Sequence, residues 1–346
     1  MISNKNEITI IRPDDFHLHL RDDEIMKTVL PHTAHVFARA IIMPNLKPPI
    51  ISLKDVFEYK KRITDNIARD YDFEPLMTIY LTQNHKPKDI EEFAKSGLVK
   101  AVKLYPCNAT TNSQYGVRDF DKIIDALQTL SQMKIPLLVH GESTEKGIDV
   151  FDREKRFIDT IFSKKLLKID GLKIVFEHIT TKEAVDFVLE NEIAATIAPQ
   201  HLLMNRNAIF DDGINPHNYC LPVLKRENHR KALLEAISKP IKKFFLGTDS
   251  APHTKNAKES SCGCAGIYSA FAAIPLYAEA FEEAGALYNF ENFCSKNGAD
   301  FYGLPYNNGV ITIVKETWTA PSAFKVNNDT SIIPLRAQKE IKWKIK

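Results

Sequence analysis

Short, continuously apolar runs alternate with amphipathic stretches along most of this chain. The runs are rich in β-branched residues, which is typical of strands buried on both faces. The stretches between them repeat their apolar residues with the period of a helix. The expected strands are 8–12, 40–45, 76–81, 101–106, 136–141, 173–178, 193–199 and 244–249. Strand and helix alternating eight times predict an α/β fold, the (β/α)8 TIM barrel.

Capping residues mark some of the expected helices. The helix expected at 52–70 begins after Ser52, with Asp55 three residues on, and the one at 86–97 ends on Gly97. The helical period also covers 117–133, 180–191 and 224–239. Two long polar stretches break the alternation, at 106–116 and 199–223, and long loops in compact domains are usually functional or disordered.

The composition narrows the class of protein. The 346 residues are 44% hydrophobic and 26% charged, as in a soluble globular protein, and the net charge of +2 favours neither nucleic acid nor an acidic membrane surface. The sequence contains no apolar stretch of membrane-spanning length and no secretory signal, and its five cysteines are scattered. We therefore expect a cytoplasmic protein with reduced thiols and one domain over 1–346, whose last part, about 307–346, is a peripheral tail.

Six side chains with ligand chemistry lie at or just past the ends of apolar runs. They are His17, His19, Lys103, His140, His178 and Asp249. Because the carboxyl ends of barrel strands meet at one rim, we expect these side chains to gather there. Imidazoles together with carboxylate oxygens can hold one or two divalent metals.

Each of these residues also has a simpler interpretation. His17 and His19 alone could form a surface pair, and His140 or His178 could be a hydrogen-bonded core histidine. The Lys103 stem could pack in the strand while its ammonium reaches the rim. Alternatively, burial lowers the pKa of a lysine, and a neutral amine can take up carbon dioxide to form a carbamate. Cys262-Gly-Cys264 is a weak metal signal, because no second cysteine pair accompanies it.

The order of these residues resembles the amidohydrolase superfamily, with His-x-His after the first strand, Lys after the fourth, His after the fifth and sixth, and Asp after the eighth. The resemblance covers about residues 10–306. It is carried by DDFHLHLRD, MPNLKPP, KLYPCNATTNSQYGV, LLVHGE, FEHITT, NRNAIFDDGINPHNYCLPVLK and FLGTDSAPHTKNAKESSCGCAG. Within the superfamily these stretches resemble the members that open and close the dihydroorotate ring.

The resemblance implies a role for particular residues. Two Zn²⁺ ions are expected per chain, although cobalt or manganese would suit the same ligands. One ion would be held by His17, His19, Asp249 and Lys103, the last as N6-carboxylysine, and the other by Lys103, His140 and His178. The implied substrate contacts are Arg21, Asn45 and His253 on a carboxylate, backbone groups near Leu221 and Ala265, and Thr110 and Thr111 on a closing loop. A homodimer is also implied.

The implied activity is the reversible interconversion of N-carbamoyl-L-aspartate and L-dihydroorotate in pyrimidine synthesis. A hydroxide bridging the metals would be the nucleophile, and Asp249 the general acid and base. Dihydropyrimidinases, hydantoinases and allantoinases share the metal ligands and are the alternative enzymes; a barrel that has lost catalysis is the alternative outside enzymes. If the first strand stays extended through Leu20, Arg21 lies on the face of His17 and His19; otherwise it pairs with Asp22 or Asp23 at the rim.

Overall fold

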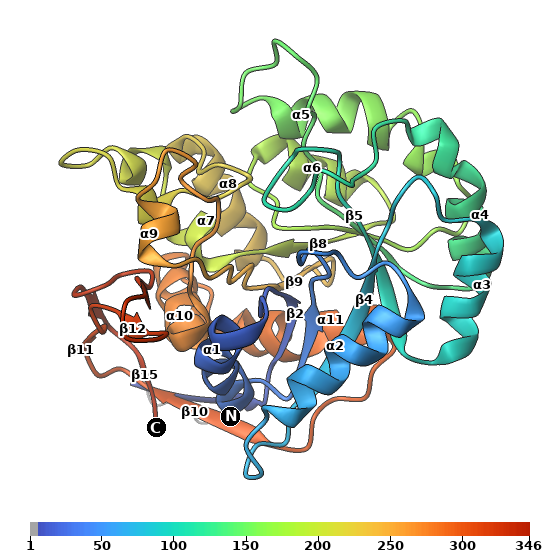
Figure 1. Ribbon diagram of the computed structural model, residues 1–346. Coiled ribbons are helices and arrows are strands. Elements are labelled where there is room, and N and C mark those ends of the chain that lie inside the picture. Colours follow the sequence, from blue (N-terminus) through green and yellow to red (C-terminus); the bar gives the residue numbers. More distant parts are fainter. Residues whose placement is uncertain (1–5) are drawn as a thin grey trace.

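The computed structural model describes residues 6–346, and within that range eight parallel strands form a barrel surrounded by helices (Figure 1). Each strand pairs with the next along the chain. The strands are β2 (Asp14–Leu18), β3 (Arg39–Ile42), β4 (Glu74–Tyr80), β5 (Val99–Leu104), β6 (Leu137–Val139), β7 (Ile174–Phe176), β8 (Ala194–Ile197) and β9 (Phe244–Leu246). The predicted (β/α)8 TIM barrel is therefore confirmed.

The barrel closes between β9 and β2 at its C-terminal rim rather than through a long ladder. The Asp249 N–H donates to the His17 carbonyl at 2.9 Å, and the His19 N–H donates to the Ser250 carbonyl at 3.1 Å. Lower down, the Thr248 N–H and hydroxyl both donate to the Asp15 carboxylate, at 2.9 and 2.6 Å. Residues that could bind metal thus also hold the barrel closed.

The predicted first strand, 8–12, is wrong as a barrel strand. β1 (Glu7–Ile11) lies outside the barrel and pairs antiparallel with β10 (Val310–Val314). The first barrel strand is β2, in which two buried carboxylates, Asp14 and Asp15, interrupt the apolar pattern. The Arg39 guanidinium forms an ion pair with Asp14 at 2.6 Å, so the buried charge has a partner.

Helices cover the outside of the barrel, and several begin and end where the sequence indicates. Ser52 and Asp55 form a capping box at the start of α2 (Leu53–Asp65), and Gly97 ends α3 (Pro87–Ser96) in the left-handed conformation. The other helices of at least eight residues are α1 (Asp23–Val36), α4 (Ile124–Gln132), α6 (Lys182–Glu190), α8 (Glu227–Ser238) and α10 (Ala273–Glu283). The shorter α-helices are α5 (Arg153–Phe157), α7 (Pro199–Leu203), α9 (Lys255–Lys258) and α11 (Asn297–Tyr302).

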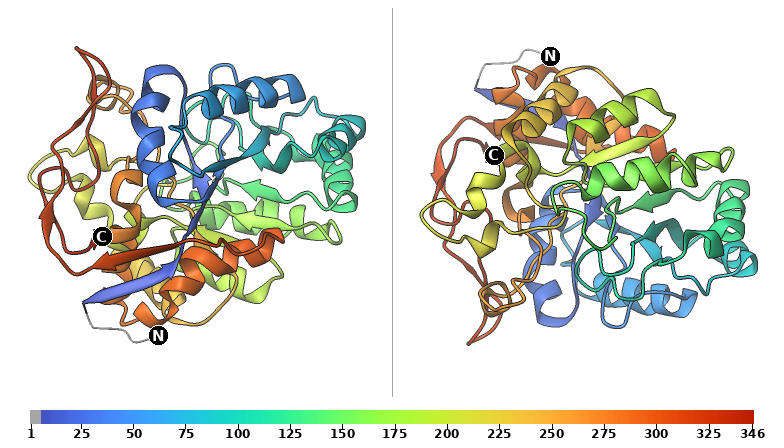
Figure 2. Two further views of the ribbon diagram at one scale, coloured as in Figure 1. Left: turned by 90° about the horizontal axis from the view of Figure 1, so that it is seen from below. Right: turned by 90° about the horizontal axis from the view of Figure 1, so that it is seen from above.

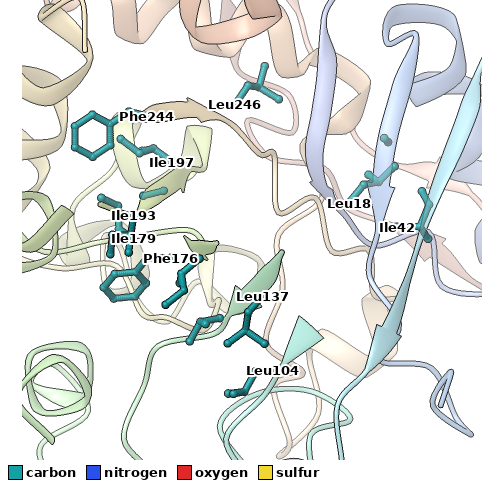
Figure 3. Packing of buried hydrophobic residues seen from close by; sticks show 14 of the residues in the cluster. Leu18, Ile42, Leu104, Leu137, Phe176, Ile179, Ile193, Ile197, Phe244 and Leu246 are labelled. Carbon is teal, nitrogen blue, oxygen red and sulfur yellow. The ribbon is translucent and has the colours of Figure 1, made fainter. Parts of the chain in front are cut away.

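The apolar core has layers on both sides of the strands. Figure 3 shows buried side chains from successive strands, among them Leu104, Leu137, Phe176 and Leu246, which belong to the large cluster shared with the helices. A second cluster contains Ala101, Leu138, Val175 and Phe245. Because strand side chains alternate, the residues two positions after Ala101, Leu138 and Val175 lie one layer higher on the same face. Those residues are Lys103, His140 and Glu177.

The chain after β10 lies outside the barrel, at the edge that Figure 2 colours red. It forms β11 (Trp318–Thr319), β12 (Phe324–Lys325), β13 (Ser331–Ile332), β14 (Glu340–Ile341) and β15 (Lys344–Ile345). Ile332, Ile341 and Trp343 are fully buried. All five cysteines are free. Across residues 6–346, no helix combines the length and the apolar character that crossing a membrane requires.

Candidate metal centre

Three of the expected ligands form a compact group at the rim of the barrel. Asp249 Oδ1 lies 3.4 Å from His17 Nε2 and 3.2 Å from His19 Nε2. These ligand atoms all lie within 4.8 Å of one another and are buried. A carboxylate oxygen between two imidazole nitrogens is a set of ligands typical of zinc and similar divalent metals.

The other expected ligands lie beside this group. His140 Nδ1 is 3.1 Å from His178 Nε2, and the rings of His17 and His178 lie 5.0 Å apart between centroids. Lys103 is fully buried, and its Nζ has no hydrogen-bond partner among the described residues. Burial lowers the pKa of Lys103 to about 8. Burial therefore increases the neutral fraction of the Lys103 amine, the form that can react with carbon dioxide, although the ammonium is still the main form at pH 7.

Hydrogen bonds on the far sides of the rings select which nitrogen faces the cavity. His17 Nδ1 donates to Glu177 at 2.7 Å, and His140 Nε2 donates to Glu142 at 2.9 Å. His19 Nδ1 donates to the Asn45 side-chain oxygen at 2.9 Å. Metal-binding histidines usually donate their other ring N–H in this way, which fixes the tautomer and the orientation of the ring.

The electrostatics of the centre also suit a metal. Burial lowers the pKa of His17, His19 and His178 well below the usual range, so these rings are neutral, the form that binds a metal. Burial raises the pKa of Asp249 to about 6, and a bound cation would oppose that shift. The unpartnered Lys103 amine, the neutral imidazoles and the carboxylate therefore fit one or more divalent metals.

Two of the ligand candidates have an unusual backbone conformation. His178 and Asp249 have φ values of 40° and 44°, in the left-handed region that side chains other than glycine rarely adopt. Strain of this kind is often found at functional sites, where it directs a side chain to a position that a regular strand does not reach.

Two of the expected carboxylate-binding residues, Arg21 and Asn45, line the cavity, and the third, His253, contacts Arg21. Arg21 Nη2 is 3.0 Å from His253 Nε2, and Arg21 Nη1 is 3.4 Å from His19 Nδ1. Asp22 pairs with Arg62 at 2.8 Å, and the Arg21 guanidinium contacts Pro252, His19 and His253, so the alternative in which Arg21 pairs with Asp22 or Asp23 is wrong. The first strand does not stay extended through Leu20 either, because β2 ends at Leu18, and Arg21 has a φ of 60°. A left-handed turn, not strand alternation, brings Arg21 to the cavity.

Thr110 and Thr111, from the polar stretch 107–116, line the cavity. The Asn45 side-chain amide donates to the Thr111 carbonyl, and the Thr111 hydroxyl donates to the Ala265 carbonyl, both at 3.0 Å. The enclosed space has a volume of only about 20 Å³, roughly enough for one water. Its walls include the expected residues His17, His19, Arg21, Asn45, Thr110, Thr111, His140, His178, Leu221, Asp249 and Ala265. Lys103 and His253 are expected site residues that do not line this space.

Several residues of the centre were not expected from the sequence. Glu142 and Glu177 orient metal-binding rings, and Tyr105, Ala251 and Gly266 line the cavity. The two glutamates did carry a signal, because each lies within two residues of a histidine at the end of an apolar run. An acidic residue there must be exposed or paired. Glu142 pairs with the nearby His140, whereas Glu177 pairs with His17 of another strand and not with its neighbour His178.

Comparison with known proteins agrees with this geometry. The model of the Amidohydrolase family matches residues 9–321. A dihydroorotase from Laribacter hongkongensis is 52% identical over 98% of this chain and 99% of its own. The crystal structure of a dihydroorotase from Campylobacter jejuni has a TM-score of 0.90 and 34% identity, covering 100% of this chain and 98% of its own. The crystal structure of Saccharomyces cerevisiae dihydroorotase in complex with 5-fluoroorotic acid has a TM-score of 0.88 and 32% identity. The match covers 99% of this chain and 98% of its own.

The chain therefore belongs to the amidohydrolase family, which is metal-dependent, and the group of His17, His19 and Asp249 suits a metal. Within that family it is a dihydroorotase, since relatives of that name match over almost the full length of both chains. An L-hydantoinase from Arthrobacter aurescens, at 13% identity and a TM-score of 0.79, shares the fold alone.

Proposed function

We propose that this chain interconverts N-carbamoyl-L-aspartate and L-dihydroorotate. The observation that carries the proposal is that Arg21, a buried cation, faces the same cavity as the metal-type ligands. A substrate with a carboxylate beside its cyclic amide needs both features, whereas a neutral ring needs only the ligands. The relatives named dihydroorotase support the same choice.

The residues of the cavity have different roles in the reaction. When bound, divalent metals at this centre supply Lewis-acid chemistry, polarising the ring carbonyl and lowering the pKa of water. Arg21, Asn45 and His253 hold the substrate carboxylate. In ring opening, Asp249 accepts the proton of the attacking water and passes it to the ring nitrogen as the C–N bond breaks. In ring closure, Asp249 takes the proton from the attacking ureido nitrogen and gives it to the departing oxygen.

We further propose two Zn²⁺ ions per chain, with Lys103 as N6-carboxylysine. The two neighbouring groups of ligand candidates support this number: Asp249 with His17 and His19, and His140 with His178. The resemblance to the amidohydrolases also supports a cytoplasmic homodimer, and the five free cysteines are compatible with a reducing compartment.

A comparison of substrates tests the proposed function, and Arg21→Met tests its basis. The parent enzyme should open dihydroorotate far faster than hydantoin or dihydrouracil, which lack the carboxylate. Arg21→Met should lower kcat/KM for dihydroorotate by about 10²-fold, because charge-assisted hydrogen bonds contribute roughly 1.5–3 kcal/mol and the substrate carboxylate loses its partner. Any residual turnover of the neutral rings should change much less.

A second arginine at the same rim provides the control. Arg62→Met removes the guanidinium that pairs with Asp22 and leaves the cavity unchanged, so its kcat/KM should stay near that of the parent. Equal losses on charged and neutral rings in Arg21→Met would assign Arg21 to the fold or the metal centre and refute its role in specificity.

We also propose that residues 107–116 form a lid, since a space of about 20 Å³ cannot admit a six-membered ring while Thr111 contacts Ala265. Thr110→Ala and Thr111→Ala should each lower kcat/KM by about 10-fold with unchanged metal content, because each removes a hydroxyl from the closed cavity. Thr111→Ser, which keeps the hydroxyl, should behave like the parent. Steady-state kinetics and metal analysis measure both effects, and parent-like kinetics in both alanine variants would contradict a lid that acts through these hydroxyls.

A further inference from the structure

Lys258, the last residue of α9, is a buried lysine whose ammonium binds backbone carbonyls instead of an acid. Only 3% of the surface of Lys258 is exposed to solvent. Its Nζ donates to the carbonyls of Tyr219, Cys264 and Gly266, at 2.7, 2.9 and 2.8 Å. A lysine ammonium has three hydrogens, so all are used. Within the described residues the contacts of Lys258 Nζ are these carbonyls and no carboxylate, which is uncommon for a buried lysine.

The three carbonyls come from two segments that form one wall of the cavity. Leu221 lies two residues after Tyr219, and Ala265 lies between Cys264 and Gly266. Leu221, Ala265 and Gly266 all line the cavity. The Gly266 N–H donates to the Tyr219 carbonyl at 3.0 Å, which joins the segments directly. A Cβ atom at Gly266 would come within 2.6 Å of the Ala251 carbonyl oxygen, so this wall is tightly packed. Through its three hydrogen bonds, Lys258 therefore joins the two segments of this wall and fixes their positions.

One peptide group of this wall connects Lys258 to the cavity. The peptide between Cys264 and Ala265 is trans, because the cis bonds within residues 6–346 are Lys47–Pro48 and Leu221–Pro222. A trans peptide directs its N–H away from its carbonyl oxygen. Since the Cys264 oxygen faces Lys258, the Ala265 N–H points to the opposite side, and no acceptor for it lies among the described residues. Ala265 is only 8% exposed, and a backbone N–H without an acceptor is rare in a residue so buried, which indicates an external acceptor.

We infer that Lys258 is a positioning residue for substrate binding, which fixes and polarises the Cys264–Ala265 peptide so that its N–H donates to an oxygen of the substrate. The inference rests on the proposed function. A cation on the carbonyl oxygen draws electron density from the peptide and makes its N–H a stronger donor. The Ala265 carbonyl also accepts the Thr111 hydroxyl and lies 3.1 Å from His253 Nε2, so the same residue contacts the lid and the carboxylate-binding group. Burial lowers the pKa of Lys258 to about 8, and the ammonium is still the main form at pH 7.

The test uses the metal-loaded enzyme, L-dihydroorotate as substrate and 5-fluoroorotate as a ligand that is not turned over. Lys258→Met should raise KM and the Kd of 5-fluoroorotate by at least about 10-fold, with metal content unchanged and kcat less affected. Lys255→Met is the matched control: it lies on the same short helix, where its ammonium is 3.8 Å from Glu259, and it should match the parent. The shift in Tm caused by 5-fluoroorotate should shrink in Lys258→Met, whereas a purely structural role would lower Tm and leave that shift unchanged.

If Lys258→Met does not fold, Lys258→Gln serves instead, because its amide can still donate to two of the carbonyls. A folded variant at this position with the Kd and KM of the parent would overturn the inference. A parent enzyme that neither opens dihydroorotate nor binds 5-fluoroorotate would overturn the proposed function and this inference with it. A parent that does both, with parent-like variants at Lys258, would overturn the inference alone.

Discussion

Replacing Lys103 with alanine is expected to lower the turnover of dihydroorotate by at least about 10³-fold, equal to roughly 4 kcal/mol of transition-state stabilisation. Lys103 is fully buried beside the metal-type ligands, and no group within the described residues accepts a hydrogen bond from its Nζ. We propose that its amine reacts with carbon dioxide and loses a proton, giving a carbamate with two oxygens for two metals. Alanine cannot form this group, so metal content per chain should fall together with kcat.

Two further variants separate the carbamate from a simple positive charge. Lys103→Arg keeps a cation, but a guanidinium stays protonated and cannot form a carbamate, so this variant should be as inactive as Lys103→Ala. Lys100→Ala removes a half-buried lysine from the same strand, β5, and should keep metal and activity. Acetate or propionate should partly restore Lys103→Ala by supplying carboxylate oxygens. A crystal structure of the fully active enzyme in which Lys103 is an unmodified ammonium would refute the proposal.

The barrel and the positions of its ligand candidates could be predicted because both follow from local patterns. Continuous apolar runs predict buried strands, and residues just past the ends of such runs meet at one rim. The first barrel strand could not be found in this way, because Asp14 and Asp15 interrupt its apolar character. Their burial becomes intelligible only with their partners: Arg39 in the next strand, and Thr248 more than two hundred residues later.

The finer geometry of the site depends on contacts that the sequence does not encode locally. Arg21 reaches the cavity through its own left-handed backbone conformation, which strand alternation does not predict. Lys255 and Lys258 look alike in the sequence, as polar residues of a short helix, yet one is exposed and the other is 3% exposed. What distinguishes them is the position of the Tyr219 and Gly266 carbonyls, which the tertiary structure sets.

Replacing Asp249 with asparagine is expected to lower kcat by about 10³-fold while much of the metal is kept, because positioned general acid–base groups typically contribute 10²–10⁴-fold. Asp249 is the carboxylate that lines the cavity, and its Oδ1 already lies between His17 and His19. The asparagine oxygen can still face a metal, but the amide cannot accept the proton of the attacking water. The Kd of 5-fluoroorotate should therefore stay near that of the parent.

Asp249→Ala is the matched comparison, since it removes the ligand oxygen as well as the proton acceptor. If Asp249 only binds metal, the asparagine variant should resemble the parent in kcat and the alanine variant alone should fail. If Asp249 also moves the proton, both variants should lose turnover, but only alanine should lose much of the metal. Metal analysis beside steady-state kinetics distinguishes the two cases, and near-parent kcat in Asp249→Asn with metal retained would exclude Asp249 as the proton carrier.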